Sequence, residues 1–167
     1  GSSFLVYLVS TSPRISKLIY FKNFMNYKII NDINLISHHV WIDNEKIFFY
    51  GKYKNQLGFF IFDFQTNEIL NKFNNEFLKL DGHPNSINGE KIVIDTYPNY
   101  LSERNLYTID LSNNYKCKHL CSFYSSFNLK DGTKCDLHPK YSDTMNKICV
   151  DTSHNNFRQV VVFDNIK

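Results

Sequence analysis

The fold is decided by a stretch that occurs twice, HPNSINGEKIVIDT at residues 83–96 and HPKYSDTMNKICVDT at residues 138–152. Each copy follows an aspartate placed two residues before its histidine, and continues into an arginine and a strand-like run ending in aspartate. A weaker third copy begins at His39. Because the three histidines are 44 and 55 residues apart, the repeat has the length of one four-stranded propeller blade.

The rest of the chain consists of short strand-like runs separated by turn residues. Its 167 residues are 43% hydrophobic, with 15 Phe, 11 Tyr and no Ala, a composition that provides a core and favours strands over helices. We predict an all-β, single-domain β-propeller of about three and a half blades. The predicted parts within residues 1–167 are a partial blade at 4–31 and blades at 37–73, 81–123 and 135–167. We expect a partial propeller, part of a larger one, or a half that closes by homo-oligomerisation through its open edges.

Charge and hydropathy exclude several classes of protein. The net charge is only +3 and the basic residues do not cluster, so we expect no nucleic-acid partner. The longest uncharged apolar stretch, Phe4–Val9, falls far short of a membrane span and follows no basic segment. We therefore expect no membrane span, a cytoplasmic location and reduced cysteines.

The two matched copies, with their Asp-x-His-Pro and Asp-Thr elements, resemble TolB-like β-propellers over about residues 37–167. More closely, they resemble the branch related to oligogalacturonate lyase and to propellers of bacterial polysaccharide gene clusters. The resemblance implies a carbohydrate-active or carbohydrate-binding propeller, lyase-like if it is an enzyme, and an acidic oligosaccharide or polysaccharide as partner. The alternative is a non-catalytic scaffold in polysaccharide or cell-envelope biosynthesis. One fold serves many functions, and no residue is identified as a catalytic base.

The histidines that open the three copies, His39, His83 and His138, are candidate metal ligands. Equivalent positions on innermost strands point toward the propeller axis, where three imidazoles can converge on one divalent ion. The resemblance implies manganese held by axial histidines; calcium and zinc are the other candidates. Alternatively, each histidine is a latch that hydrogen-bonds within or between blades. In the metal hypothesis, Asp81 and Asp136 orient the rings.

A second candidate site lies at the ends of the second strands, where propeller loops bind ligands. Its residues are carboxylates, arginines and rings suited to an acidic sugar: Asp95, Tyr97, Arg104, Asp151, His154 and Arg158. The alternative is that each aspartate and arginine pair holds a blade turn.

Overall fold

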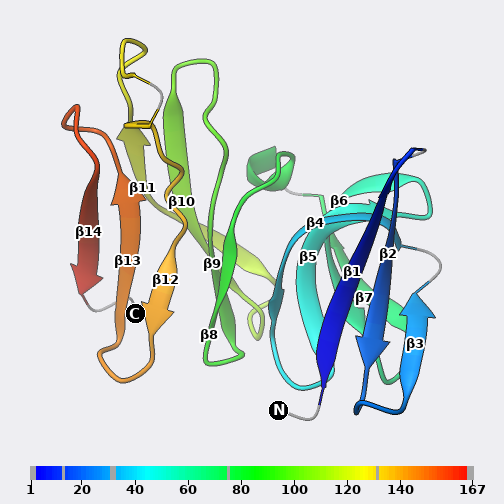
Figure 1. Ribbon diagram of the computed structural model, residues 1–167. Coiled ribbons are helices and arrows are strands. Elements are labelled where there is room, and N and C mark those ends of the chain that lie inside the picture. The colour runs from blue at the N-terminus through cyan, green and yellow to red at the C-terminus, as the bar shows by residue number, and fades with distance from the viewer. Residues whose placement is uncertain (1–2, 13, 31–32, 75, 131, 165–167) are drawn as a thin grey trace. The chain divides into compact units, whose positions relative to one another are not determined.

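The computed structural model describes residues 3–12, 14–30, 33–74, 76–130 and 132–164, which form strands and one short 3-10 helix (Figure 1). The all-β prediction is confirmed. The chain divides into two compact units, residues 1–81 and 82–167. The described residues contain no helix with the length and hydropathy of a membrane span.

The first unit holds two antiparallel sheets with strands in chain order. The three-stranded sheet consists of β1 (Phe4–Thr11), β2 (Arg14–Phe21) and β3 (Tyr27–Ile30). The four-stranded sheet consists of β4 (Ile33–Trp41), β5 (Lys46–Tyr53), β6 (Gln56–Asp63) and β7 (Glu68–Phe73), followed by the 3-10 helix η1 (Glu76–Leu78).

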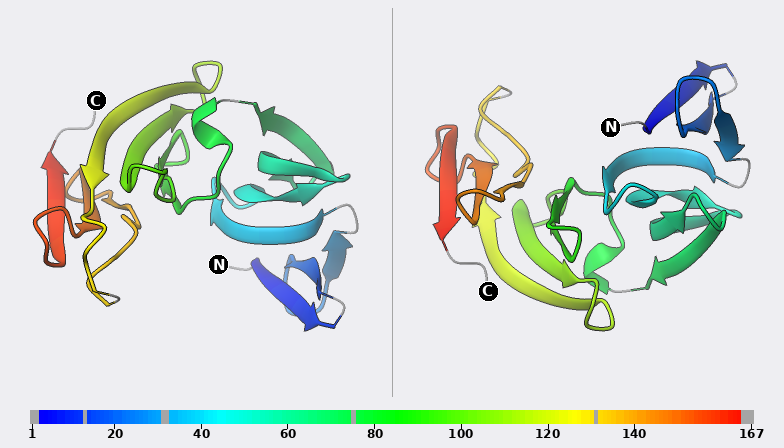
Figure 2. Two further views of the ribbon diagram at one scale, coloured as in Figure 1. Left: turned by 90° about the horizontal axis from the view of Figure 1, so that it is seen from above. Right: turned by 90° about the horizontal axis from the view of Figure 1, so that it is seen from below.

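The second unit repeats this plan. Its four-stranded sheet consists of β8 (Pro84–Ile87), β9 (Lys91–Asp95), β10 (Glu103–Asp110) and β11 (Lys116–Tyr124). Its three-stranded sheet consists of β12 (Lys140–Ser142), β13 (Lys147–Thr152) and β14 (Gln159–Asp164). Views from above and below show the order of the strands within each sheet (Figure 2).

Each unit is held by a core between its two sheets. Strand alternation turns Leu18 and Tyr20 of β2 toward Phe49 and Phe60 of the next sheet, and all four side chains are buried. In the second unit, the core is formed by aliphatic side chains of both sheets and of the segment before β12: Ile87, Val93, Leu106, Leu137, Ile148 and Val150. Aromatic side chains thus fill the space between the sheets of the first unit. The cysteines at 117, 121, 135 and 149 are free thiols.

Asp63 and Asp110, which end β6 and β10, fix turns. Asp63 Oδ1 accepts hydrogen bonds from the backbone N–H groups of Gln65 and Thr66, at 2.7 and 3.2 Å. Asp110 Oδ1 accepts two equivalent bonds, both at 3.1 Å. Such a side chain stabilises the turn from the third to the fourth strand. The recurrence of aspartate at this repeat position is therefore explained by a structural role.

Candidate functional site

The centre of the repeat in the second unit is the carboxylate of Asp95, whose side chain is fully buried at the end of β9. Its Oδ1 accepts a hydrogen bond from the backbone N–H of His83 at 2.6 Å and also contacts His83 Nδ1 at 3.0 Å. Its Oδ2 accepts the backbone N–H of His138 at 3.0 Å. One side chain therefore connects the β8–β11 sheet to the segment that leads into β12.

The backbone around Asp95 leaves no room for a larger residue at position 82. A Cβ added to Gly82 would collide with the backbone oxygen of Asp95. The glycine of the Asp-Gly-His-Pro segment thus permits the close approach that brings the His83 amide to the carboxylate.

The His83 and His138 imidazoles lie side by side, with ring centroids 3.8 Å apart. The Nδ1 atom of His83 hydrogen-bonds Asp95, whereas that of His138 lies 3.3 Å from the backbone oxygen of Asp136. The Tyr97 ring meets His83 edge-on at 5.5 Å. The His83 side chain is 13% exposed and His138 is exposed, so the pair reaches the surface of this unit.

His138 has the backbone conformation most favourable to glycine, with φ of +41°. This conformation is uncommon for residues with a Cβ, and at functional sites it is retained because surrounding contacts hold it. Here the contacts are the two bonds of His138, to Asp95 and to the Asp136 carbonyl. Each imidazole thus has an oxygen acceptor beside its Nδ1 atom: the Asp95 carboxylate for His83 and the Asp136 carbonyl for His138.

The structure favours a packing role for Arg104, a predicted sugar-binding residue. Arg104 is 6% exposed. Its Nε donates to Asp136 Oδ1 at 3.0 Å and its guanidinium reaches Ser125 Oγ at 3.4 Å. Asp136 is thus the partner of an arginine on β10, and the carboxylate that orients the His83 ring is Asp95. Asp136 lies beside the His138 ring through its backbone carbonyl, while its carboxylate pairs with Arg104, and Asp81 contacts His38.

Three further predicted sugar-binding residues, Asp151, His154 and Arg158, lie at or beside the turn between β13 and β14. Arg158 donates to Asp151 Oδ2 at 2.9 Å in an exposed pair, and this hydrogen bond raises the pKa of the arginine. His154 Nδ1 lies 3.1 Å from Thr152 Oγ1 and 3.2 Å from Gln159 Nε2. Asp151 is the repeat equivalent of Asp95, but it forms an ion pair at the surface instead of a buried set of hydrogen bonds.

Strand register corrects the alignment of the first repeat copy. His39 pairs with Phe49, as Pro84 pairs with Ile94, so His39 occupies the position of the proline. The residue equivalent to His83 is His38, at an irregularity in β4. A shift of one residue turns a side chain to the other face of a strand. His39 is exposed.

Sequence reasoning passed over His38 and the carboxylate that holds it. Asp81 accepts a hydrogen bond from Ser37 Oγ at 2.5 Å and lies 3.1 Å from His38 Nδ1. Tyr50 occupies the strand position that Asp95 holds in β9, and burial and Asp81 raise its pKa. The signal was available, because His38 and His83 both stand eight residues before the lysine that opens the second strand.

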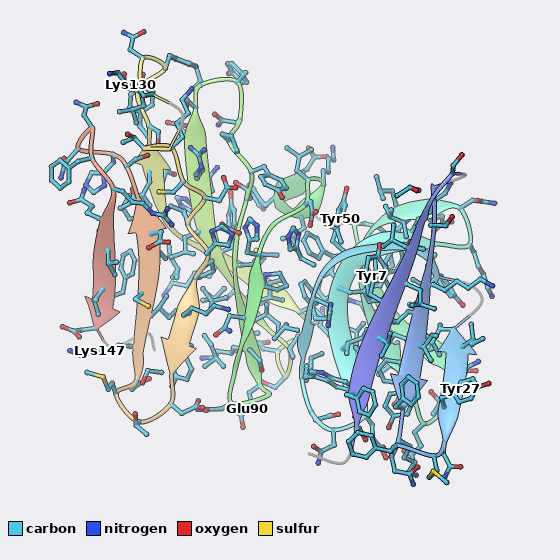
Figure 3. All side chains as sticks on the ribbon, in the orientation of Figure 1. Tyr7, Tyr27, Tyr50, Glu90, Lys130 and Lys147 are labelled. Carbon is cyan, nitrogen blue, oxygen red and sulfur yellow. The ribbon has the colours of Figure 1, made fainter. Side chains whose placement is uncertain are left out.

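A pocket of about 480 Å³ opens beside this group in the first unit and includes Tyr7, Tyr50, Ser37 and Asp81. Figure 3 shows Tyr7 on β1 and Tyr50 on β5. The described residues contain no group of three or more His, Cys, Asp or Glu side chains able to hold a metal. In each unit, one imidazole contacts a carboxylate: His38 contacts Asp81, and His83 contacts Asp95. In the second unit, the His138 imidazole lies beside that of His83.

Comparison with solved structures shows the fold. TolB from Acinetobacter baumannii matches 99% of the chain, with a TM-score of 0.67 and 13% identity. The β-propeller domain of the Trilobed protease from Pyrococcus furiosus, described as having an open velcro topology, matches 100%, with a TM-score of 0.65 and 15% identity. Oligogalacturonate lyase in complex with manganese matches 88%, with a TM-score of 0.61 and 17% identity.

These matches confirm the predicted TolB-like β-propeller fold in a partial form. The chain spans 40%, 52% and 40% of the three matched chains, about half of each or less. No family model matches the chain, and no curated protein matches it in sequence.

Proposed function

We propose that this chain is a carbohydrate-binding propeller module in which His83 and His138 hold a divalent metal ion that binds an acidic saccharide. The observation that carries the proposal is the pair of imidazoles 3.8 Å apart, each with its Nδ1 beside an acceptor. Metal-binding histidines usually have such a partner, a carboxylate or a backbone carbonyl, on the nitrogen that does not face the metal.

The donor set fits a divalent ion as two of its ligands. Neutral imidazole binds manganese and zinc through the nitrogen remote from the hydrogen-bonded one. Because the described residues contain no group of three His, Cys, Asp or Glu side chains able to hold a metal, the other coordination positions would be left to water and to oxygen atoms of the ligand. The bound ion would supply positive charge that attracts carboxylates.

The saccharide class follows from the neighbours of the pair. Tyr97 provides an aromatic surface beside His83 against which a sugar ring can pack. One solved structure with this fold is an oligogalacturonate lyase in complex with manganese, which supports an acidic sugar as the ligand to test. Asp95 is occupied by three hydrogen bonds and is a poor candidate for a catalytic base, so we propose binding without bond cleavage.

The test is calorimetric titration with tetragalacturonate, with Mn²⁺ or with EDTA. The variant is His83→Asn/His138→Asn, because asparagine tolerates the left-handed backbone of position 138 and keeps its N–H. The control is His119→Asn on β11, which removes an exposed imidazole elsewhere. We expect binding only with Mn²⁺, at least tenfold weaker in the double variant and unchanged in the control. Equal binding by the double variant, or none by the wild type with Mn²⁺, would refute the proposal.

A second function is favoured by the backbone bonds of Asp95. The carboxylate accepts the N–H groups of both His83 and His138 and so joins two sheets whether or not a metal is bound. If neither metal nor saccharide binds, the chain is best described as a non-catalytic scaffold in which the histidine repeat is a latch.

A further inference from the structure

A pocket of about 840 Å³ in the first unit has no role in the proposed function. It lies between the β2–β3 turn and the β4–β5 turn. Its wall combines two aromatic rings with polar and charged side chains: Ser3, Tyr20, Lys22, Asn23, Trp41, Asp43, Asn44 and Glu45. Pockets of this size, partly aromatic and with a few polar groups, are typical of small-molecule binding sites.

Both turns that form the rim are held in shape by their own side chains. Asn23 Oδ1 accepts hydrogen bonds from two backbone N–H groups of its turn, at 3.1 and 2.8 Å. Asp43 Oδ1 accepts two equivalent bonds in the other turn, both at 2.8 Å. A rim that is ordered before binding loses little conformational entropy when a ligand arrives.

The two aromatic rings of the pocket wall are held in place by contacts with each other and with Phe64. Trp41 is half-buried, with its ring centroid 5.6 Å from that of Phe64 and 6.3 Å from that of Tyr20. Tyr20 and Phe64 stack at 4.2 Å. Within the described part of the chain, the Trp41 indole N–H makes no hydrogen bond, and no buried side-chain nitrogen lacks a partner. The indole N–H is therefore open to solvent, on a ring that lines the pocket.

We infer that this pocket binds a neutral oligosaccharide. The C–H face of a pyranose packs on an aromatic ring, while its hydroxyl groups need both donors and acceptors. The indole N–H and the Asn44 amide supply donors, and the Glu45 carboxylate supplies an acceptor, all on the pocket wall. Asp43 is paired with Lys46 at 2.9 Å, whereas no described cation pairs with Glu45. Lys22 on the same wall balances the Glu45 carboxylate, so the wall carries no net positive charge that would favour a uronate over a neutral sugar.

The experiment uses fluorescence, because Trp41 is the only tryptophan of the chain. The probes are cellotetraose, maltotetraose, mannotetraose, chitotetraose and galactotetraose, with tetragalacturonate and adenosine as comparators. At least one neutral probe should shift the emission of Trp41 saturably, and more tightly than either comparator. Asn44→Ala and Glu45→Gln should each weaken that binding at least tenfold. Asn128→Ala, an exposed amide on the other unit, should not change it.

Three results would overturn the inference: no shift with any neutral probe, tighter binding of a comparator, or unchanged affinity in both rim variants. Failure here is separable from failure of the proposed function. The His83→Asn/His138→Asn variant should keep the Trp41 response to the neutral probe, since those histidines belong to the other unit. Loss of that response in the histidine variant, with the first unit still folded by near-ultraviolet circular dichroism, would also contradict an independent site.

Discussion

Replacement of Asp95 by asparagine tests whether the repeat joins two neighbouring sheets. The wild-type carboxylate is fully buried and accepts the backbone N–H groups of His83 and His138 together with His83 Nδ1. Asparagine has nearly the same shape, but one of its two terminal atoms donates hydrogen bonds. That atom would face a backbone N–H, so one buried donor would lose its partner.

The expected cost follows from these contacts. A hydrogen bond to a charged group contributes about 1.5–3 kcal/mol, and a buried donor left unpaired costs about 1–3 kcal/mol. We therefore expect Asp95→Asn to lower the free energy of unfolding by about 4 kcal/mol, in line with the roughly 3–5 kcal/mol lost when a buried charged pair is broken. In a chain of this length, that corresponds to a Tm lower by roughly 8–16 °C.

The matched control is Asp151→Asn, which changes the same repeat position in the next sheet. Its carboxylate is 31% exposed and pairs with an exposed arginine, so we expect a loss below about 1 kcal/mol. The assays are thermal unfolding and hydrogen exchange at the amides of His83 and His138. Equal stability of the two variants, or protected amides in Asp95→Asn, would refute the latch.

Three further predictions concern other positions. Gly82→Ala should cost about 2–3 kcal/mol in denaturant unfolding, because its Cβ meets the backbone oxygen of Asp95; a neutral result would contradict the close approach. Arg104→Gln should cost about 3–5 kcal/mol, since it leaves a partly buried carboxylate without its ion pair, and unaltered unfolding would exclude a packing role. Partial burial raises the pKa of Asp43, but hydrogen bonds from its turn and from Lys46 bring it below its usual value. Its contribution is therefore fully present above the ordinary pKa of an aspartate, about 4, and is lost as the pH falls through the lowered pKa. The stability gap to Asp43→Asn, below about 1 kcal/mol at neutral pH, should close as the pH falls below about 4.

The repeat predicted the fold because a blade is a local unit, with each strand paired to its neighbour in sequence. The first copy was aligned one residue out of register. His39 was taken as the equivalent of His83, although His38 keeps the eight-residue spacing to the lysine, and the pairing of His39 with Phe49 shows that His38 is the equivalent residue. Repeats locate blades reliably, whereas side-chain direction depends on single-residue register.

The roles of the polar repeat residues were also beyond the sequence. Aspartate and arginine side chains usually lie at the surface, so the sequence gives no reason to bury either Asp95 or Arg104. The structure buries both. The Trp41 ring packs on Phe64 and also lines a pocket, a double role that its residue type does not reveal. Partners distant in the chain, such as Asp136 for Arg104, decide which polar residues stay at the surface.

The most direct test of the proposed function is the metal content of the protein, purified without a histidine tag and measured by elemental analysis. The account predicts near-stoichiometric manganese or zinc in the wild type, and its loss in His83→Asn/His138→Asn but not in His119→Asn. Absence of metal from the wild type after incubation with each ion and desalting would contradict the proposal, as would equal metal in the double variant.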